Sequence, residues 1–204
     1  MFTGIITDIG RVQNVTTTSK GEGEGRRFEI ETVFEMDRVS IGASIACSGA
    51  CMTVVEKSDH TFTIEVSAES LSKTTLGSWQ SGTRVNLERA MCLGDELGGH
   101  MVSGHVDGIG TLTDRTQDGD SQRLIFAVSP DLKKFIAAKG SVTVDGISLT
   151  INEVNYGKAQ TTFGINVIPH TQMETTLGAL PVDGHVNVEI DMLARYVANL
   201  LAHK

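Results

Sequence analysis

The sequence repeats itself along its length. Residues 1–10 return in altered form as residues 101–110, and three further blocks recur in the same order. These blocks pair 44–56 with 141–153, 74–77 with 175–178 and 85–88 with 186–189, at spacings of 97 to 101 positions. Because the four blocks recur in the same order and at nearly constant spacing, the sequence predicts two copies of a domain of about 100 residues. We expect domains at residues 1–97 and 98–190, followed by a tail at 191–204.

Each copy has the pattern of short β-strands. Residues 61–66, 85–87 and 186–190 alternate apolar and polar side chains, as strands with one buried face do. The chain has 22 glycines and 3 prolines, and glycine-rich breaks follow at short intervals, which indicates tight turns. Small antiparallel barrels fit this pattern best, because closing a sheet removes its exposed edges. The predicted fold class is all-β.

Two segments are predicted to be helical. Ser129 and Pro130 are suited to begin a short helix that carries Leu132, Phe135 and Ile136 and ends before Gly140. A second helix is expected from Asp191, a plausible N-cap, to the C-terminus. Its apolar stripe consists of Leu193, Tyr196, Val197, Leu200 and Leu201. Roughly 13 residues are marginal for an isolated helix, so the stripe must pack on its own barrel or on a partner subunit. The pattern favours neither.

Charge and composition exclude several classes of protein. The 17 Lys and Arg against 25 Asp and Glu give a net charge of −8, which argues against a nucleic-acid partner. No apolar run approaches the roughly 18 residues of a membrane span, and residues 1–8 lack the features of a signal peptide. Three cysteines, an odd number, indicate no disulfide scaffold. We expect a cytoplasmic protein with no nucleic-acid or membrane partner.

A zinc site needs consideration because two cysteines and two histidines lie at short spacings. Cys47 and Cys51 are four positions apart, and His100 and His105 are five apart. However, the two pairs are far apart in the sequence, and side chains five apart on a strand point to opposite faces. Buried cysteines and unrelated histidines are the better interpretation, and no metal is expected.

Positions that differ between the copies are the better guide to chemistry. Cys51 matches Ser148, so two nucleophile-type side chains occupy one position of the repeat. Three further differences pair Phe2 with Val102, Ile5 with His105 and Ala90 with Asp191. Each has a plain alternative: a packing cysteine, a surface histidine or a helix cap. Together they indicate an asymmetric site built on a symmetric scaffold.

At these motifs the sequence resembles the riboflavin synthase family. The resemblance covers essentially the whole chain and is carried by MFTGII (1–6), LGGHMVSGHV (97–106), DGISLT (145–150), TTLG (175–178) and VNVEID (186–191). It implies two tandem six-stranded antiparallel Greek-key β-barrels and a C-terminal α-helix, assembled as a homotrimer. It also implies conversion of two 6,7-dimethyl-8-ribityllumazine molecules into riboflavin and 5-amino-6-(D-ribitylamino)uracil, without a cofactor or metal.

The resemblance further implies two lumazine pockets, with the active site joining the first barrel of one subunit to the second barrel of a neighbour. The first pocket is expected to comprise Cys51, Met52, Thr53, Glu65, Val66, Ser67, Ala68, Glu69, Ser70, Gly104, His105 and Val106. The second is expected to comprise Gly4, Ile5, Ile6, Ser148, Leu149, Thr150, Asn166, Val167, Ile168, Pro169, His170 and Thr171. Lys139 falls where the family has a substrate contact from the neighbouring subunit. His170 departs from the glutamate of the family pattern.

Family positions tied to activity are Phe2, Cys51, His105, Ser148 and Asp191. The reaction must remove a proton from the acidic 7-methyl group of one lumazine, and His105 has a suitable unperturbed pKa. The other lumazine must be activated by Cys51, Ser148 or water, while Asp191 could stabilise charge. The assignment of base and nucleophile stays open. The alternative is a non-catalytic lumazine-binding or flavin-binding antenna protein, which should have lost second-pocket residues such as Ser148, Thr150 and Asp191.

Overall fold

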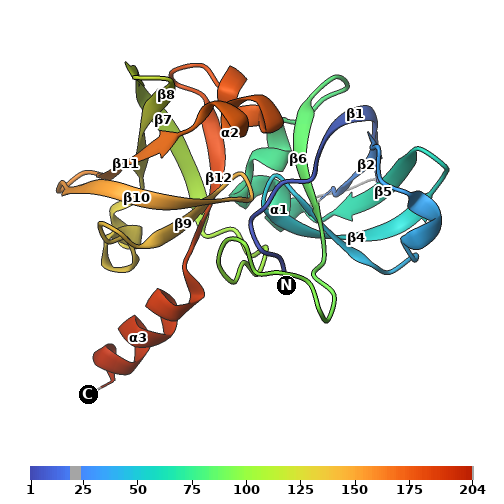
Figure 1. Cartoon of the computed structure of the whole chain (residues 1–204). Helices are drawn as coiled ribbons and strands as arrows, with labels where there is room; N and C mark the ends of the chain where they lie inside the picture. The colour runs from blue at the N-terminus through green and yellow to red at the C-terminus, as the bar shows by residue number, and fades with distance from the viewer. Residues whose placement is uncertain (19–23, 204) are drawn as a thin grey trace.

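The computed structural model describes residues 1–18 and 24–203 and consists of two closed antiparallel barrels and one projecting helix (Figure 1). The first barrel contains β1 (Asp8–Thr17), β2 (Arg26–Glu31), β3 (Ser44–Cys47), β4 (Ala50–Lys57), β5 (Thr61–Val66) and β6 (Arg84–Arg89). The second contains β7 (Gly108–Asp118), β8 (Ser121–Val128), β9 (Ser141–Val144), β10 (Ile147–Tyr156), β11 (Thr161–Val167) and β12 (His185–Ile190). The prediction of two six-stranded barrels and a terminal helix is confirmed.

The two barrels have the same strand order. The first closes as β1-β2-β5-β4-β3-β6, and the second as β7-β8-β11-β10-β9-β12. Register shifts recur at matched places, after Val12 in β1 and Leu112 in β7, and after Val54 in β4 and Ile151 in β10. Such bulges increase local bend and twist, which helps a short sheet to close.

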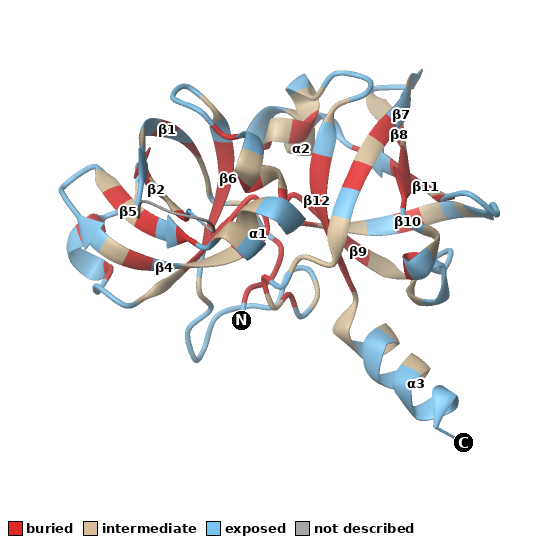
Figure 2. Ribbon diagram, turned by 180° about the vertical axis from the view of Figure 1, so that it is seen from behind, coloured by how far each residue is buried: buried red, intermediate tan, exposed pale blue. Residues whose placement is uncertain are grey.

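Each barrel has its own apolar core, made by the inward side chains of its strands (Figure 2). In the first barrel, the rings of Phe28 and Trp79 meet edge to face, with centroids 5.6 Å apart. In the second, Phe126 and Phe163 stack with centroids 5.8 Å apart. Aromatic pairs of this kind add to the stabilisation that area burial gives, so each copy has the core of an independent domain.

Two asparagines join the barrels by reciprocal hydrogen bonds. The Asn86 side chain donates to the carbonyl of Asp145 at 2.9 Å, and Asn187 donates to the carbonyl of Ser48 at 2.8 Å. Their side-chain oxygens accept, each at 2.8 Å, from the backbone N–H of Thr176 and Thr75 respectively. Both side chains are buried, so these bonds satisfy groups that would otherwise be costly to bury. The repeat is therefore also a pseudo-two-fold arrangement in space.

Short helices follow several strands. The predicted helix after Ser129 is a 3₁₀ helix, η3 (Pro130–Phe135), which ends well before Gly140. The others are η1 (Met36–Arg38), α1 (Ala68–Lys73), η2 (Thr75–Ser78), α2 (Pro169–Glu174) and η4 (Thr176–Ala179). The sequence analysis did not predict α1 or α2, because six residues are too few to display a helical period.

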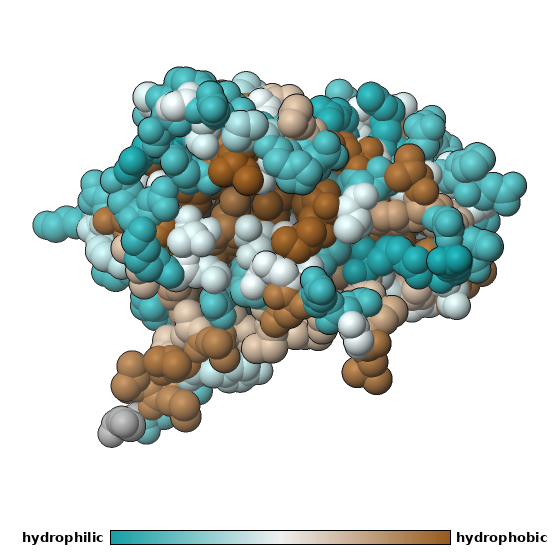
Figure 3. Space-filling view, in the orientation of Figure 1, coloured by the Kyte–Doolittle hydropathy of each residue, from teal (hydrophilic) through white to brown (hydrophobic). Residues whose placement is uncertain are grey.

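The last helix, α3 (Met192–Ala202), projects away from both barrels (Figures 1 and 2). Asp191 caps it as predicted, with its carboxylate accepting from the Leu193 N–H at 2.8 Å. The predicted apolar stripe is exposed, at 56% to 68% for its five side chains, and gives the helix an apolar surface (Figure 3). The hypothesis that the stripe packs on its own barrel is therefore wrong. No helix among the described residues has the length and apolarity to cross a membrane.

Candidate active site

The segments that precede the barrels cross to the opposite barrel. We call residues 1–7 the first leader and residues 101–107 the second leader. The carbonyl of Gly4 accepts from the backbone N–H of Ser148 in the second barrel, and the carbonyl of Gly104 accepts from that of Cys51 in the first, both at 2.8 Å. Each barrel therefore displays its nucleophile-type residue against the leader of the other copy.

Glycine is required at both crossing points. Gly4 and Gly104 have φ of +80° and +79°, a region that side chains disfavour. A Cβ at Gly4 would lie 2.5 Å from the Cβ of Ser148, and one at Gly104 would lie 2.5 Å from the Cβ of Cys51. A side chain at either glycine would thus push the leader away from the residue that it contacts.

The two leaders also pair with each other. Phe2 donates to the carbonyl of Val102 at 2.8 Å, and Val102 donates back at 3.1 Å. The ring of Phe2 is fully buried in a small cluster with Ala46 and Val102. Within one chain this predicted site residue is thus a packing element beneath the leaders and presents no exposed face.

The first predicted site gathers around Cys51. The side chains of Cys51 and Met52 are half-buried, and Thr53 is exposed. Gly104 contacts Cys51 through the bond described above, His105 is exposed, and Val106 packs on the core of the first barrel. The further predicted wall runs from the end of β5 into α1, where the Ser67 hydroxyl accepts from the Ser70 N–H at 3.2 Å.

The second predicted site repeats this arrangement around Ser148. Ser148 and Leu149 are half-buried and Thr150 is exposed; Ile5 is exposed, while Ile6 packs on the core of the second barrel. The wall comprises Asn166, Val167, Ile168, Pro169, His170 and Thr171, which run from β11 into α2, with His170 exposed. Lys139 is exposed in the loop before β9, at φ of +68°.

His100, which was not among the residues predicted from the sequence, contacts the predicted site residue Ser148. Its Nδ1 lies 2.7 Å from the Ser148 hydroxyl oxygen, and its Nε2 lies 3.3 Å from that of Thr143. Burial lowers the pKa of His100, and the nearby Asp191 carboxylate opposes that change. Of the residues selected from the repeat, Ser148 thus contacts the His100 imidazole directly, while Asp191 acts on it through its charge. Such a hydroxyl–imidazole pair suits proton transfer.

The repeat could not reveal His100 because it has no matched position in the first copy. The available signal was its two preceding glycines. A Cβ at Gly99 would lie 2.7 Å from the Cβ of Ser148 and 2.2 Å from the Thr3 carbonyl oxygen, so backbone packs tightly there.

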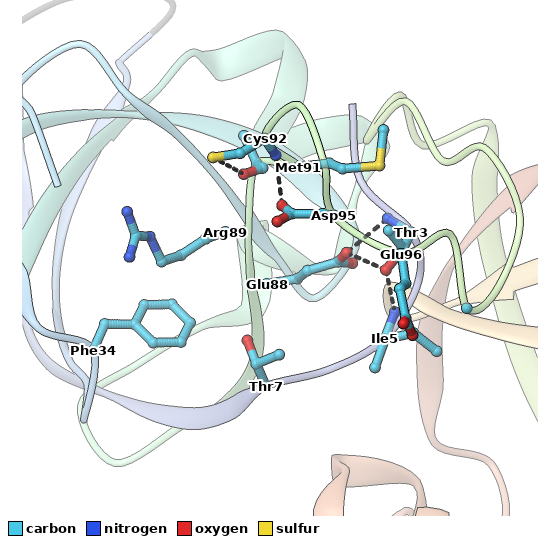
Figure 4. A pocket seen from close by; sticks show the side chains of 12 residues that line it. Thr3, Ile5, Thr7, Phe34, Glu88, Arg89, Met91, Cys92, Asp95 and Glu96 are labelled. Carbon is cyan, nitrogen blue, oxygen red and sulfur yellow. Dashed lines mark hydrogen bonds between the residues drawn. The ribbon is translucent and has the colours of Figure 1, made fainter. Parts of the chain in front are cut away.

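A cavity of about 670 Å³ lies beside the first leader (Figure 4). Its lining includes Thr3, Phe34, Glu88 and Cys92, and Ile5 is its only residue from the predicted pockets. A second cavity, of about 420 Å³, includes Ala68 of the predicted first pocket in its lining. Across the described ranges 1–18 and 24–203, no three His, Cys, Asp or Glu side chains cluster to hold a metal ion.

Comparison with known proteins identifies the family. The family described as "Lumazine binding domain" matches the chain twice, at residues 3–90 and 103–191. Curated riboflavin synthases match over the whole chain: that of Brucella abortus is 46% identical, covering 100% of both chains, and that of Bacillus subtilis is 37% identical, covering 100% of this chain and 91% of the relative.

Solved structures agree with this result. A crystal structure of LumP complexed with riboflavin superposes with a TM-score of 0.79 at 25% identity, covering 93% of this chain and 99% of that one. LumP complexed with 6,7-dimethyl-8-(1'-D-ribityl) lumazine gives a TM-score of 0.77 at 24% identity and matches in fold. The chain belongs to the riboflavin synthase family and carries the lumazine-binding domain twice in tandem.

Proposed function

We propose that this chain is a riboflavin synthase, an enzyme that converts two 6,7-dimethyl-8-ribityllumazine molecules into riboflavin and 5-amino-6-(D-ribitylamino)uracil. The observation that carries the proposal is the crossing of the leaders, which sets Cys51 and Ser148 each against the leader of the other copy and so supports two similar but unequal pockets. Two identical substrates need two similar pockets, and their different fates need unequal ones. The full-length identity to curated riboflavin synthases supports the same conclusion.

The reaction moves a four-carbon unit from one lumazine to the other. One substrate is oxidised to the flavin as the other is reduced to the diaminouracil, so no external oxidant is required. The protein must bind both substrates, remove a proton from one 7-methyl group and activate the other ring for attack. Positioning alone can supply roughly 7–11 kcal/mol of such a barrier.

We assign the second barrel's chemistry to Ser148, His100 and Asp191. A lowered pKa keeps the His100 imidazole neutral near pH 7, so that it can accept the proton of the Ser148 hydroxyl. Asp191 is suited to stabilise the imidazolium that forms. In the first barrel, Cys51 and the exposed His105 are the corresponding candidates, with His105 as a base for the methyl proton. Phe2 supports the leaders that carry these groups.

We further propose a homotrimer that assembles through α3, with Lys139 of one subunit reaching the site of another. The exposed apolar stripe of α3 supports this assembly. In this proposal, residues 1–97 and 98–190 are the two lumazine-binding domains, and 191–204 is the oligomerisation helix. The acidic net charge and the three free cysteines support a cytoplasmic location.

The second candidate function is a lumazine-binding or flavin-binding antenna protein, which the structural likeness to LumP favours. Incubation of the purified chain with 6,7-dimethyl-8-ribityllumazine separates the two. Riboflavin production at a rate proportional to the protein concentration supports the synthase. Binding, seen as quenching or a shift of lumazine fluorescence, without riboflavin formation would establish the antenna protein and overturn the proposal.

A further inference from the structure

Two buried glutamates hold the leaders in place. Glu88, in β6, is 5% exposed and Glu189, in β12, is 3% exposed. Burial raises the pKa of both carboxyl groups, and hydrogen bonds from the leaders oppose that rise. A buried carboxylate is costly unless it is well hydrogen-bonded, so such residues need a reason to be there.

Every hydrogen bond that compensates these carboxylates comes from a leader. Glu88 accepts from the Thr3 N–H at 2.6 Å and the Thr3 hydroxyl at 2.7 Å (Figure 4). It also accepts from the Gly4 N–H at 3.0 Å. Glu189 accepts from the Ser103 N–H at 2.7 Å, the Ser103 hydroxyl at 2.6 Å and the Gly104 N–H at 2.9 Å. The two sets of three hydrogen bonds therefore match almost atom for atom, and we call each set a clamp.

The leader residues that each glutamate binds also contact the candidate catalytic residues or lie next to them in the sequence. The N–H of Gly104 is bound by Glu189 while its carbonyl is bound by the Cys51 N–H. The Ser103 hydroxyl, which donates to Glu189, also accepts from the N–H of His105 at 3.3 Å. Glu189 therefore fixes both the backbone beside Cys51 and the backbone of His105. Glu88 acts in the same way on Ser148 and Ile5, through Gly4 and Thr3.

We propose that Glu88 and Glu189 are positioning residues that act crosswise: Glu189 of the second barrel orders the first barrel's site, and Glu88 of the first barrel orders the second barrel's site. Neither carboxylate belongs to the barrel whose site it orders. As a statement about catalysis this inference rests on the proposed function, whereas the ordering itself is measurable without turnover.

Glutamine is the informative substitution. It keeps the size of the side chain and one acceptor oxygen, but its NH₂ group would face the glycine N–H where the second carboxylate oxygen accepted. Glu189→Gln therefore releases Gly104, and Glu88→Gln releases Gly4. Each variant is the matched control for the other, and Glu35→Gln removes the same charge from an exposed position.

One chemical probe and one spectroscopic probe report on the two sites separately. Alkylation of Cys51 by iodoacetamide, in a Cys92→Ser background, reports on the first site, since Cys47 is fully buried and Cys92 is exposed. The pH titration of the His100 ring by NMR reports on the second site. We expect Glu189→Gln to speed Cys51 alkylation about tenfold, the effect of losing one charged hydrogen bond, without moving the His100 midpoint. Glu88→Gln should give the reverse pattern.

In turnover, each variant should lower kcat about tenfold with a smaller effect on KM, because the residues align reacting groups. If either glutamine variant fails to fold, Ser103→Ala and Thr3→Val remove the hydroxyl links alone and should give the same crossed pattern more weakly. The inference would be overturned by equal changes at both probes or by no change at either. It would also be overturned if the only change were in the barrel that contains the substituted glutamate. A crossed pattern in a chain that forms no riboflavin would uphold it and remove the proposed function instead.

Discussion

The two barrels share a strand order and matched bulges but differ in the residues available for chemistry. Both have a glycine leader, a buried glutamate and a bridging asparagine at matched positions. Among the residues that the structure describes, only the second barrel has an imidazole bonded to its nucleophile-type residue, and only its last strand leads directly into an α-helix. The difference teaches that backbone geometry is held in common, while the candidate groups for proton transfer and for partner binding are added to one copy.

The largest expected effect comes from the helix that the first barrel lacks. Changing Leu200→Asp together with Leu201→Asp places two charges on the exposed stripe of α3. If the stripe is the trimer contact, the oligomer should dissociate and activity should be nearly abolished, because burying either leucine contributes roughly 1.5–3 kcal/mol. Sedimentation velocity and the rate of riboflavin formation measure the two effects.

The barrels of this double variant should remain folded, since the two side chains are 68% and 64% exposed. Circular dichroism checks this point, and Asn199→Asp is the control on the same helix. A variant that stays trimeric would show that other surfaces hold the subunits together. A fully active monomer would place the complete site within one chain.

The next effect concerns the imidazole found only in the second barrel. His100→Gln should lower single-turnover rates by roughly 10²-fold, the usual contribution of a proton-transfer group. Ser148→Ala should cost about as much, and the double variant little more, because the two side chains act as one unit. If the losses of the two single variants add up in the double variant, Ser148 and His100 act independently.

A smaller effect is expected in ligand binding. A non-reactive lumazine analogue should bind at two sites per chain whose Kd values differ roughly tenfold, about the worth of one hydrogen bond. The difference should arise where the pockets diverge, at Cys51 against Ser148 and at Glu69 against His170. Isothermal calorimetry measures both constants. A single site in an active preparation would argue against the second pocket.

The last prediction concerns the free energy of unfolding and separates Asp145 from its counterpart Ser48. Burial raises the pKa of Asp145 to about 7, so the folded state holds a proton that the unfolded state releases above about pH 4. This contribution to stability is complete below that pH and is lost as the pH rises through 7, with a slope of up to about 1.4 kcal/mol per pH unit. Asp145→Asn should flatten this slope in urea unfolding measured from pH 4 to 8. An unchanged slope would assign it to other groups.

Much of the fold can be predicted from the sequence, because the repeat includes residues that the backbone conformation requires. Gly4 and Gly104, or Gly49 and Gly146, recur because only glycine fits their φ and their close approaches, and so they mark the repeat in the sequence. The alternation in strands such as β5 is equally visible because one face of a closed sheet is buried.

The site was only partly predictable. Comparing the two copies selected Cys51, Ser148 and Asp191, because these positions differ between the copies. The comparison could not select His100, which has no matched position. It could not select Glu88 or Glu189 either, because the two matched positions hold the same residue. The contact of each leader with the opposite barrel came from the family resemblance. Periodicity within one copy has no information about which barrel a preceding segment touches, since that depends on how the two copies pack.

The crossed leaders have a consequence for synthesis on the ribosome. Gly4 is translated before the first barrel, but its hydrogen-bond partner Ser148 emerges only after every strand of that barrel has been made. The first barrel can fold around its own core while its leader waits for the second barrel, which is a contact of very long sequence separation. A chain released early would therefore be a folded barrel with an unfinished site, so truncated products should be inert even when they are stable.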